Sequence, residues 1–75
     1  MDLSDEVCLI EVPVKAEWVG HNLMELNLRK KYGINVVALK QGSVIDVTID
    51  PTQPLLEGDL LVVIAETAKL HKLKE

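Results

Sequence analysis

One stretch decides the fold: residues 22–40, with the sequence NLMELNLRKKYGINVVALK. Asn22 is a typical helix N-cap, and Glu25, placed three residues later, completes the pattern of a capping box. Apolar residues follow at helical spacing. Gly33 can adopt the left-handed conformation that ends many helices. The stretch therefore predicts one helix over residues 23–32.

The end of that helix carries three cations, Arg29, Lys30 and Lys31. Positive charge at this position suits the negative end of the helix dipole. Ile34, just beyond the helix, is placed to pack back on Leu28. We expect the chain to turn there and continue directly as a strand.

Four segments predict strands. The segment 43–49 alternates apolar and polar residues, so it is expected to be half buried, whereas the last strand is apolar on both faces. The tail, 67–74, is expected to form a short helix. The sequence thus predicts an α+β domain with a small four-stranded sheet in the order β-α-β-β-β and a short C-terminal helix. The predicted strands are 7–12, 34–40, 43–49 and 60–65.

The connections between these strands are short. Gln41 and Gly42 are expected to form a tight turn, and residues 50–54, with two prolines, form a loop. The side chains of Leu55 and Leu56 are expected to pack into the core and so anchor that loop.

The chain has 75 residues, of which 48% are apolar and nearly all of those aliphatic. A domain of this size buries only about 60% of the surface that its unfolded chain exposes. The single cysteine, Cys8, allows no internal disulfide. We therefore expect residues 1–6 to be a tail or linker, residues 7–75 to form one domain, and a second copy to support it as a homodimer.

The predicted helix covers one face of the sheet, and the other face needs a cover as well. Either the tail or another chain can supply it. For a dimer contact, our first expectation is the helix together with the sheet edge near Val36 and Val62.

Charge and hydropathy exclude several classes of protein. A net charge of −4 and a pI near 5.0 argue against binding to DNA or RNA. The longest apolar run, 60–65, is far shorter than the roughly 20 residues of a membrane span, which argues against direct membrane insertion. The acidic N-terminus is unlike a signal peptide, and with a free cysteine it indicates the cytoplasm.

No pattern typical of an enzyme is present. His21 and His71 have no serine, cysteine and acid arrangement around them, and Cys8 is expected to be a buried hydrophobic residue. Asp46 and Asp50 suit a solvated strand edge better than a ligand set. The four glycines are isolated, so no phosphate-cradling loop is predicted. With a single cysteine and only two histidines, no metal site is predicted either.

The end of the helix, residues 27–35, is chemically distinctive because it gathers donors around an aromatic ring in an acidic chain. Two interpretations fit it. One is a solvated helix end whose cations complement the dipole. The other is an anion or nucleotide site, in which an arginine makes two parallel hydrogen bonds to a phosphate while amides bind base or ribose.

Two ordered motifs resemble the RCK C-terminal domain family, also called TrkA-C. The first is Val19–Arg29 followed by Tyr32–Lys40, and the second is Leu56–Ile64 with its Gly-Asp pair. The resemblance covers roughly residues 7–66 and is strongest to the potassium-uptake Ktr-type branch. Gln41 stands where the family often has arginine, and Ala65 where it favours glycine, which affects a turn and a strand end.

This resemblance implies a dimeric, ligand-sensing domain of a cytosolic gating ring that controls a membrane potassium channel or transporter. Several members bind cyclic di-AMP at the dimer interface. No resident cofactor is implied, because this chain lacks the Gly-rich segment that binds NAD or ATP in the family's other domain. For the same reason, we expect the chain to be either an excised C-terminal domain or a short relative.

The resemblance also assigns residues to that ligand site. Arg29 is implied for phosphate and Asn35 for a polar contact to base or ribose. The remaining members are Asn27 and Pro51 as pocket lining and Met24 and Ile34 as base-packing residues. The alternative is a structural dimerisation domain of an antiporter or transcription regulator that binds no small molecule.

Overall fold

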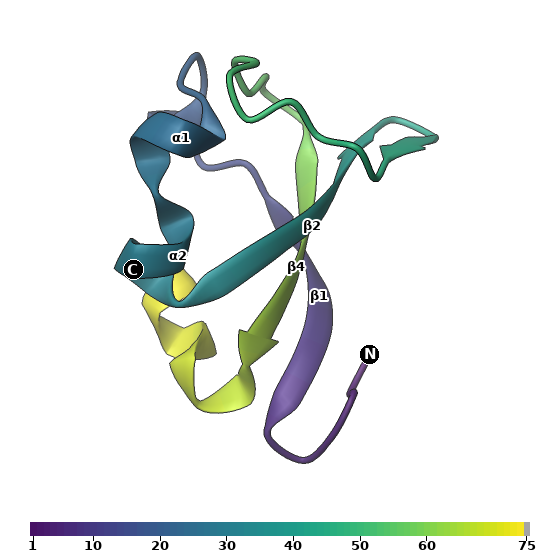
Figure 1. The fold of residues 1–75 in the computed structure, drawn as a ribbon, viewed down its shortest axis with the longest axis vertical. Helices are drawn as coiled ribbons and strands as arrows, with labels where there is room; N and C mark the ends of the chain where they lie inside the picture. Colours follow the sequence, from purple (N-terminus) through teal and green to yellow (C-terminus); the bar gives the residue numbers. More distant parts are fainter. Residues whose placement is uncertain (75) are drawn as a thin grey trace.

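A computed structural model describes residues 1–74 of the chain (Figure 1). It contains four strands, two short α-helices and two 3-10 helices, which are written η. The strands are β1 (Val7–Pro13), β2 (Ile34–Gln41), β3 (Val44–Asp46) and β4 (Leu60–Glu66), and the helices are η1 (Ala16–Trp18), α1 (Leu23–Leu26), α2 (Leu28–Tyr32) and η2 (Thr67–Lys74).

All neighbouring strands are antiparallel, in the spatial order β1-β4-β2-β3. The last strand, β4, is therefore central, and it is flanked by β1 and β2. A bulge interrupts the pairing of β2 with β4 between Val36 and Ala38. The predicted α+β class and four-stranded sheet are confirmed.

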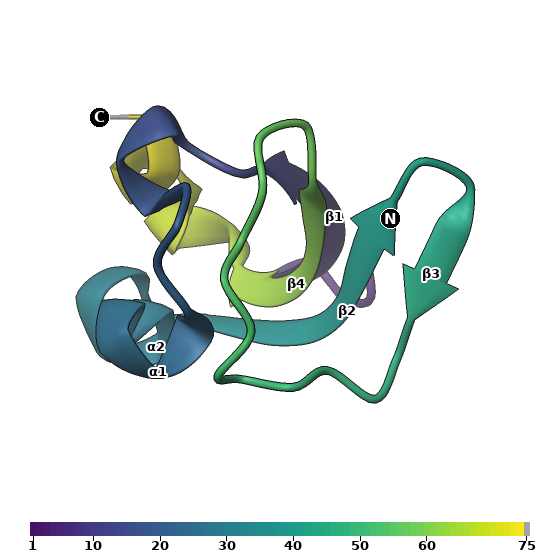
Figure 2. The same cartoon turned by 90° about the horizontal axis from the view of Figure 1, so that it is seen from above.

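The helical elements lie together on one side of the sheet (Figures 1 and 2). On that face Leu61 and Val63 of β4 are buried, and Trp18 packs over them with 1% of its surface exposed. Leu70 and Leu73 of η2 join the same core. The tail thus covers the face that α1 and α2 already cover, and the expectation that it might cover the opposite face is wrong.

The opposite face of the sheet stays open. Val62 and Ile64 of β4 are only half buried there, although the strand is apolar on both faces as predicted. Val36 packs against the core on the covered face, and Val62 belongs to a central strand. The expected sheet edge therefore exists only at Val36, on the part of β2 that β3 does not cover, because β4 has a neighbour on each side. The dimer contact expected there stays a prediction.

The predicted helix over 23–32 is broken at Asn27, which has a φ of 46° and so adopts the left-handed conformation. Asparagine tolerates this conformation better than other residues with a Cβ. The start and end are confirmed: the Asn22 side chain accepts the Glu25 N–H at 2.8 Å, and Gly33 ends α2 with a φ of 71°. One continuous helix was the wrong prediction, because helical periodicity does not reveal a single left-handed residue.

The strand predicted over 43–49 is much shorter than expected, and all three residues of β3 are exposed. The side chain of Asp46 accepts the N–H of Thr48 at 2.9 Å, so the backbone turns away from the sheet. Gln41 pairs with Val44, which makes Gly42 and Ser43 the turn instead of Gln41 and Gly42. Gly42 has a φ of 62°, which suits the first position of a two-residue hairpin loop.

The loop after β3 is anchored by Leu55, which is buried as predicted. Leu56 is 54% exposed, so the prediction that both leucines anchor the loop is confirmed for Leu55 and wrong for Leu56. The buried carboxylate of Asp59 explains the difference: it accepts the Leu56 N–H at 3.0 Å and the Gln41 side-chain amide at 3.2 Å. This turn fixes the backbone of Leu56 and leaves its side chain outside.

Residues 1–6, expected as a tail or linker, fold back along β1. The N–H of Leu9 donates to the carbonyl of Met1 at 2.8 Å, and Asp2 forms a bridge with Cys8. Because β1 is an edge strand, this segment covers part of its free edge.

Candidate functional site: a hollow at the broken helix

A hollow of about 270 Å³ lies where α1, α2 and the start of β2 meet. β2 pairs with β3 only over residues 39–41, so its first residues have β4 on one side and no strand on the other within residues 1–74. The hollow follows this open edge of β2 and is here called the Arg29 hollow. Its lining residues are Leu23, Asn27, Leu28, Arg29, Ile34, Asn35 and Val36.

Four of the six predicted site residues meet in the Arg29 hollow. Arg29 and Asn35 are both exposed, so their polar groups are available to a ligand. Asn27 lies between the two helices. Ile34 is 1% exposed and belongs to the core, so it lines the hollow as part of its wall.

The break at Asn27 shapes this hollow. The left-handed residue separates α1 from α2, and its N–H still donates to the carbonyl of Leu23 at 3.1 Å. Gly33, left-handed as well, turns the chain from α2 into β2. Two sharp turns six residues apart thus bring Arg29 and Asn35 to the same opening.

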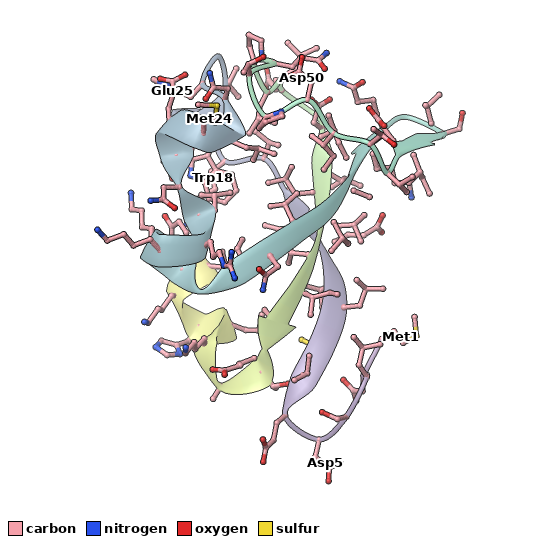
Figure 3. All side chains as sticks on the ribbon, in the orientation of Figure 1. Met1, Asp5, Trp18, Met24, Glu25 and Asp50 are labelled. Carbon is pink, nitrogen blue, oxygen red and sulfur yellow. The ribbon has the colours of Figure 1, made fainter. Side chains whose placement is uncertain are left out.

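Met24 and Pro51 do not line the Arg29 hollow; instead they contact each other. The N–H of Met24 donates to the carbonyl of Pro51 at 3.3 Å, and the Met24 side chain is 67% exposed. Figure 3 shows Met24 and Asp50 at the same end of the molecule, with Trp18 between the helices and the sheet. The two residues form a second, neighbouring group on α1 and the loop beside it.

The loop that carries Pro51 is held firmly in place. The carboxylate of Asp50 accepts the hydroxyl of Thr52 at 2.6 Å and its N–H at 2.9 Å. These two hydrogen bonds, with that of the hydroxyl the stronger cause, lower the pKa of Asp50 from its ordinary value. The N–H of Leu55 also donates to the carbonyl of His21 at 2.9 Å, which ties the loop to the start of α1.

The capping box at the start of α1 also carries a perturbed carboxylate. Glu25 accepts the N–H of Asn22 at 3.0 Å and lies 3.3 Å from Nδ1 of His21. The backbone hydrogen bond, followed by the histidine contact, lowers the pKa of Glu25 from its ordinary value. Glu25 therefore stays ionised at neutral pH and stabilises the start of the helix.

The Arg29 hollow is suited to an anionic ligand. No carboxylate is among its lining residues within the described chain, and Arg29 contributes a planar, permanently charged fork of donors. The amide of Asn35 both donates and accepts hydrogen bonds. Residues 1–74 contain no group of three or more His, Cys, Asp or Glu residues able to hold a metal ion.

Three apolar lining residues were not predicted as part of the site: Leu23, Leu28 and Val36. Leu23 lies four residues before Asn27, and helical spacing could have indicated it. Val36 gave no such signal, because its place depends on β3 being too short to cover the first half of β2.

Comparison with known proteins gives the family. The model of the TrkA-C domain matches residues 8–75. The chain is 32% identical, over its whole length, to Ktr system potassium uptake protein C of Bacillus subtilis (strain 168) and spans 34% of that protein. It thus covers about a third of the length of this curated relative.

Solved structures agree with this fold. The RCK C domain of potassium transport protein KtrA, in complex with cyclic diadenosine monophosphate, superposes with a TM-score of 0.84 at 29% identity, covering 96% of this chain and 85% of that one. The RCK_C domain dimer of S. agalactiae BusR, at 22% identity and a TM-score of 0.71, covers 92% of this chain and 85% of its own and shares the fold.

Among the described residues, no helix has the length and apolar character that crossing a membrane requires. The family match extends over nearly the whole chain, and it includes α2, the open edge of β2 and the Gly58-Asp59 turn. This chain belongs to the TrkA-C domain family.

Proposed function

We propose that this chain is the ligand-sensing regulatory module of a potassium-transport gating protein and that it binds cyclic di-AMP, or a similar small anionic ligand, as a dimer. One observation carries the proposal: Arg29 and Asn35 open into the same hollow. The KtrA domain that is 29% identical to this chain was solved with cyclic di-AMP, which supports the choice of ligand.

The chemistry of the Arg29 hollow fits a dinucleotide. The guanidinium of Arg29 can pair with a phosphate through two parallel hydrogen bonds, and the Asn35 amide suits a base or ribose edge. The aliphatic wall, which includes Leu23 and Val36, offers a surface on which a base can pack. A cyclic dinucleotide is itself two-fold symmetric, so it matches a site shared by two identical chains.

A dimer would also give a partner to exposed apolar side chains outside the hollow. Met24 is 67% exposed, Val47 is 74% exposed, and Val37 lies on the open half of β2. We define these three residues as the apolar rim. Pairing two apolar rims would place two Arg29 hollows opposite each other, with Asn27 and Pro51 beside the ligand and Ile34 behind it.

The module acts by binding and is not catalytic. A ligand that fits one arrangement of the two chains better than another shifts the population of the dimer, and ordinary coupling of this kind is about 1–3 kcal/mol. In the full-length protein, this shift would reach a membrane potassium channel or transporter from the cytoplasm. The module needs no resident cofactor for this role.

Calorimetry with cyclic di-AMP tests the ligand. We expect saturable binding of one nucleotide per two chains, and Arg29→Ala should weaken it by about tenfold or more because a charge-assisted pair is lost. Lys30→Ala is the matched control, since it removes the same charge from α2 but does not line the hollow. Absence of heat with the wild-type protein, or equal loss in both variants, would contradict the proposal.

Sedimentation without ligand tests the dimer separately. Wild-type protein at micromolar concentration should show twice the monomer mass, and Val47→Asp should shift it toward monomer because a charge would be buried in the apolar rim. Leu3→Asp, at an exposed position outside the apolar rim, should leave the dimer unchanged. A wild-type dimer that gives no heat with cyclic di-AMP would instead support the alternative of a purely structural dimerisation domain in an antiporter or transcription regulator.

A further inference from the structure

A second hollow, of about 360 Å³, lies between α2 and η2 and is here called the Tyr32 hollow. It shares no lining residue with the Arg29 hollow. Figure 1 shows η2 beside α2, and the two elements pack against each other. The lining residues are Lys31 and Tyr32 from α2 and His71 and Lys72 from η2.

The charge of the chain is strongly segregated around this hollow. Residues 26–45 and residues 67–74 contain no Asp or Glu, and together they carry every lysine and arginine except Lys15. The fold brings α2 from the first segment against η2 from the second. Within the described residues, the junction of α2 and η2 therefore brings basic side chains together in an otherwise acidic protein.

The two rings of the Tyr32 hollow are held in place. Tyr32 contacts the edge of Trp18 with a centroid distance of 5.8 Å, and the Lys15 ammonium lies 5.1 Å above the Tyr32 ring. Nδ1 of His71 lies 3.0 Å from the carbonyl of Ala68. Because a carbonyl only accepts, Nδ1 carries a proton in this contact, and Nε2 is the nitrogen left for another partner.

The two lysines of the hollow differ from Lys40 and Lys69, which have carboxylate partners. Lys40 pairs with Glu11 and Lys69 pairs with Glu66, each at 3.1 Å. Within residues 1–73, no carboxylate lies within 4.0 Å of the ammonium group of Lys31 or Lys72. Their charges are therefore not neutralised by a described acidic side chain.

We propose that the Tyr32 hollow binds a phosphate-type oxyanion, either inorganic phosphate or the phosphoryl group of a small molecule. The ammonium groups of Lys31 and Lys72 supply two positive charges, and the hydroxyl of Tyr32 supplies a neutral donor. The hollow is concave and built from only four side chains, so it suits a compact anion better than an extended polymer. This site is independent of the nucleotide proposed for the Arg29 hollow.

Inorganic phosphate, titrated at constant ionic strength and followed by amide NMR, tests this site. We expect saturable shifts at Tyr32 and His71, and Lys31→Gln or Lys72→Gln should weaken binding roughly three- to tenfold, as expected for partly solvated charged contacts. Tyr32→Phe should weaken it less, because the ring packing remains. Lys30→Gln, on the same helix but outside the hollow, should leave the affinity nearly unchanged.

Chemical shifts that grow linearly with phosphate, without saturation, would overturn the proposal. An equal loss of phosphate affinity in Lys31→Gln and Lys30→Gln would overturn it as well. Both results would indicate diffuse attraction of phosphate to a basic surface. Arg29→Ala should retain the phosphate response while losing cyclic di-AMP. The reverse result, in which Arg29→Ala abolishes the phosphate response, would assign the anion to the first hollow and contradict a second site.

Discussion

The two faces of the sheet differ sharply, although β4 supplies aliphatic side chains to both. On the covered face, Leu61 and Val63 lie under Trp18 and three helical elements and are fully buried. On the open face, Val62 and Ile64 remain half buried, and the exposed side chains of the β2–β3 hairpin continue this surface. The covered face is complete within one chain, whereas the open face is not.

This difference separates what the chain needs for folding from what it offers to a partner. A tightly packed face specifies the monomer fold, because every removed side chain leaves a cavity. An exposed aliphatic face gives little to the monomer and suits association. Substitutions on the two faces should therefore have different consequences, which can be measured separately.

The largest expected effect follows from Trp18→Ala on the covered face. Trp18 is 1% exposed and also holds Tyr32 by an edge contact, so its removal should cost about 3–5 kcal/mol of the free energy of unfolding. Val47→Ala, on the apolar rim, is the control. It should change the free energy of unfolding of the monomer by less than about 0.5 kcal/mol.

Chemical denaturation at several protein concentrations measures both variants, because the stability of a dimer depends on concentration. The contrast between the covered face and the apolar rim would be wrong if Val47→Ala destabilised the protein as much as Trp18→Ala at low concentration.

Much of the fold was predictable because it depends on local signals. The capping box of Asn22 and Glu25, the left-handed Gly33 and the apolar character of β4 all act over a few residues. The shortness of β3 was not predictable from alternation, because the side chain of Asp46 competes with the sheet for the backbone. The position of η2 on the covered face depends on the central place of β4, which local sequence does not reveal.

The candidate site was predictable only in part, for a similar reason. Arg29 and Asn35 lie near each other in sequence, and the turn at Gly33 returns the chain to the same opening. Pro51 is distant in sequence, and its contact with Met24 arises from the loop that packs over α1. The Tyr32 hollow joins α2 to η2, so neither segment alone indicated it.

A smaller effect is expected at Asn27, which joins the covered face to the open edge of β2. Asn27→Ala should cost about 1–2 kcal/mol of the free energy of unfolding, because alanine tolerates the φ of 46° poorly. Asn27→Gly accepts this φ and should stay within about 0.5 kcal/mol of the wild type. Calorimetric unfolding of both variants separates the backbone requirement from any contact that the amide makes with ligand. Equal stability of the two variants would contradict a conformational role.

The smallest effect concerns pH and the capping box of α1. The pKa of Glu25 is lowered from its ordinary value because its carboxylate accepts the N–H of Asn22 and, secondarily, contacts His21. A group whose pKa is lower in the folded state stabilises the fold fully above its ordinary pKa, and this contribution is lost as the pH falls through the lowered value. Small changes of pH near neutrality should therefore not change the stability that Glu25 gives to the start of α1. In acid, protonation of Glu25 should make the start of α1 less stable.

Carboxyl NMR titration measures this directly, with a midpoint for Glu25 expected below the ordinary value of a glutamate. Glu25→Gln is the matched variant, because its amide oxygen still accepts the Asn22 N–H but does not titrate. In thermal melts from about pH 7 to about pH 3, Glu25→Gln should lose less stability than the wild type, since one linked proton is removed. The pKa of Asp50 is lowered independently, by hydrogen bonds from Thr52. Asp50 should therefore titrate identically in both proteins. A Glu25 midpoint at or above the ordinary value of a glutamate would mean that the capping contact is not maintained in solution. The cap would then not order the part of α1 that lines the Arg29 hollow through Leu23.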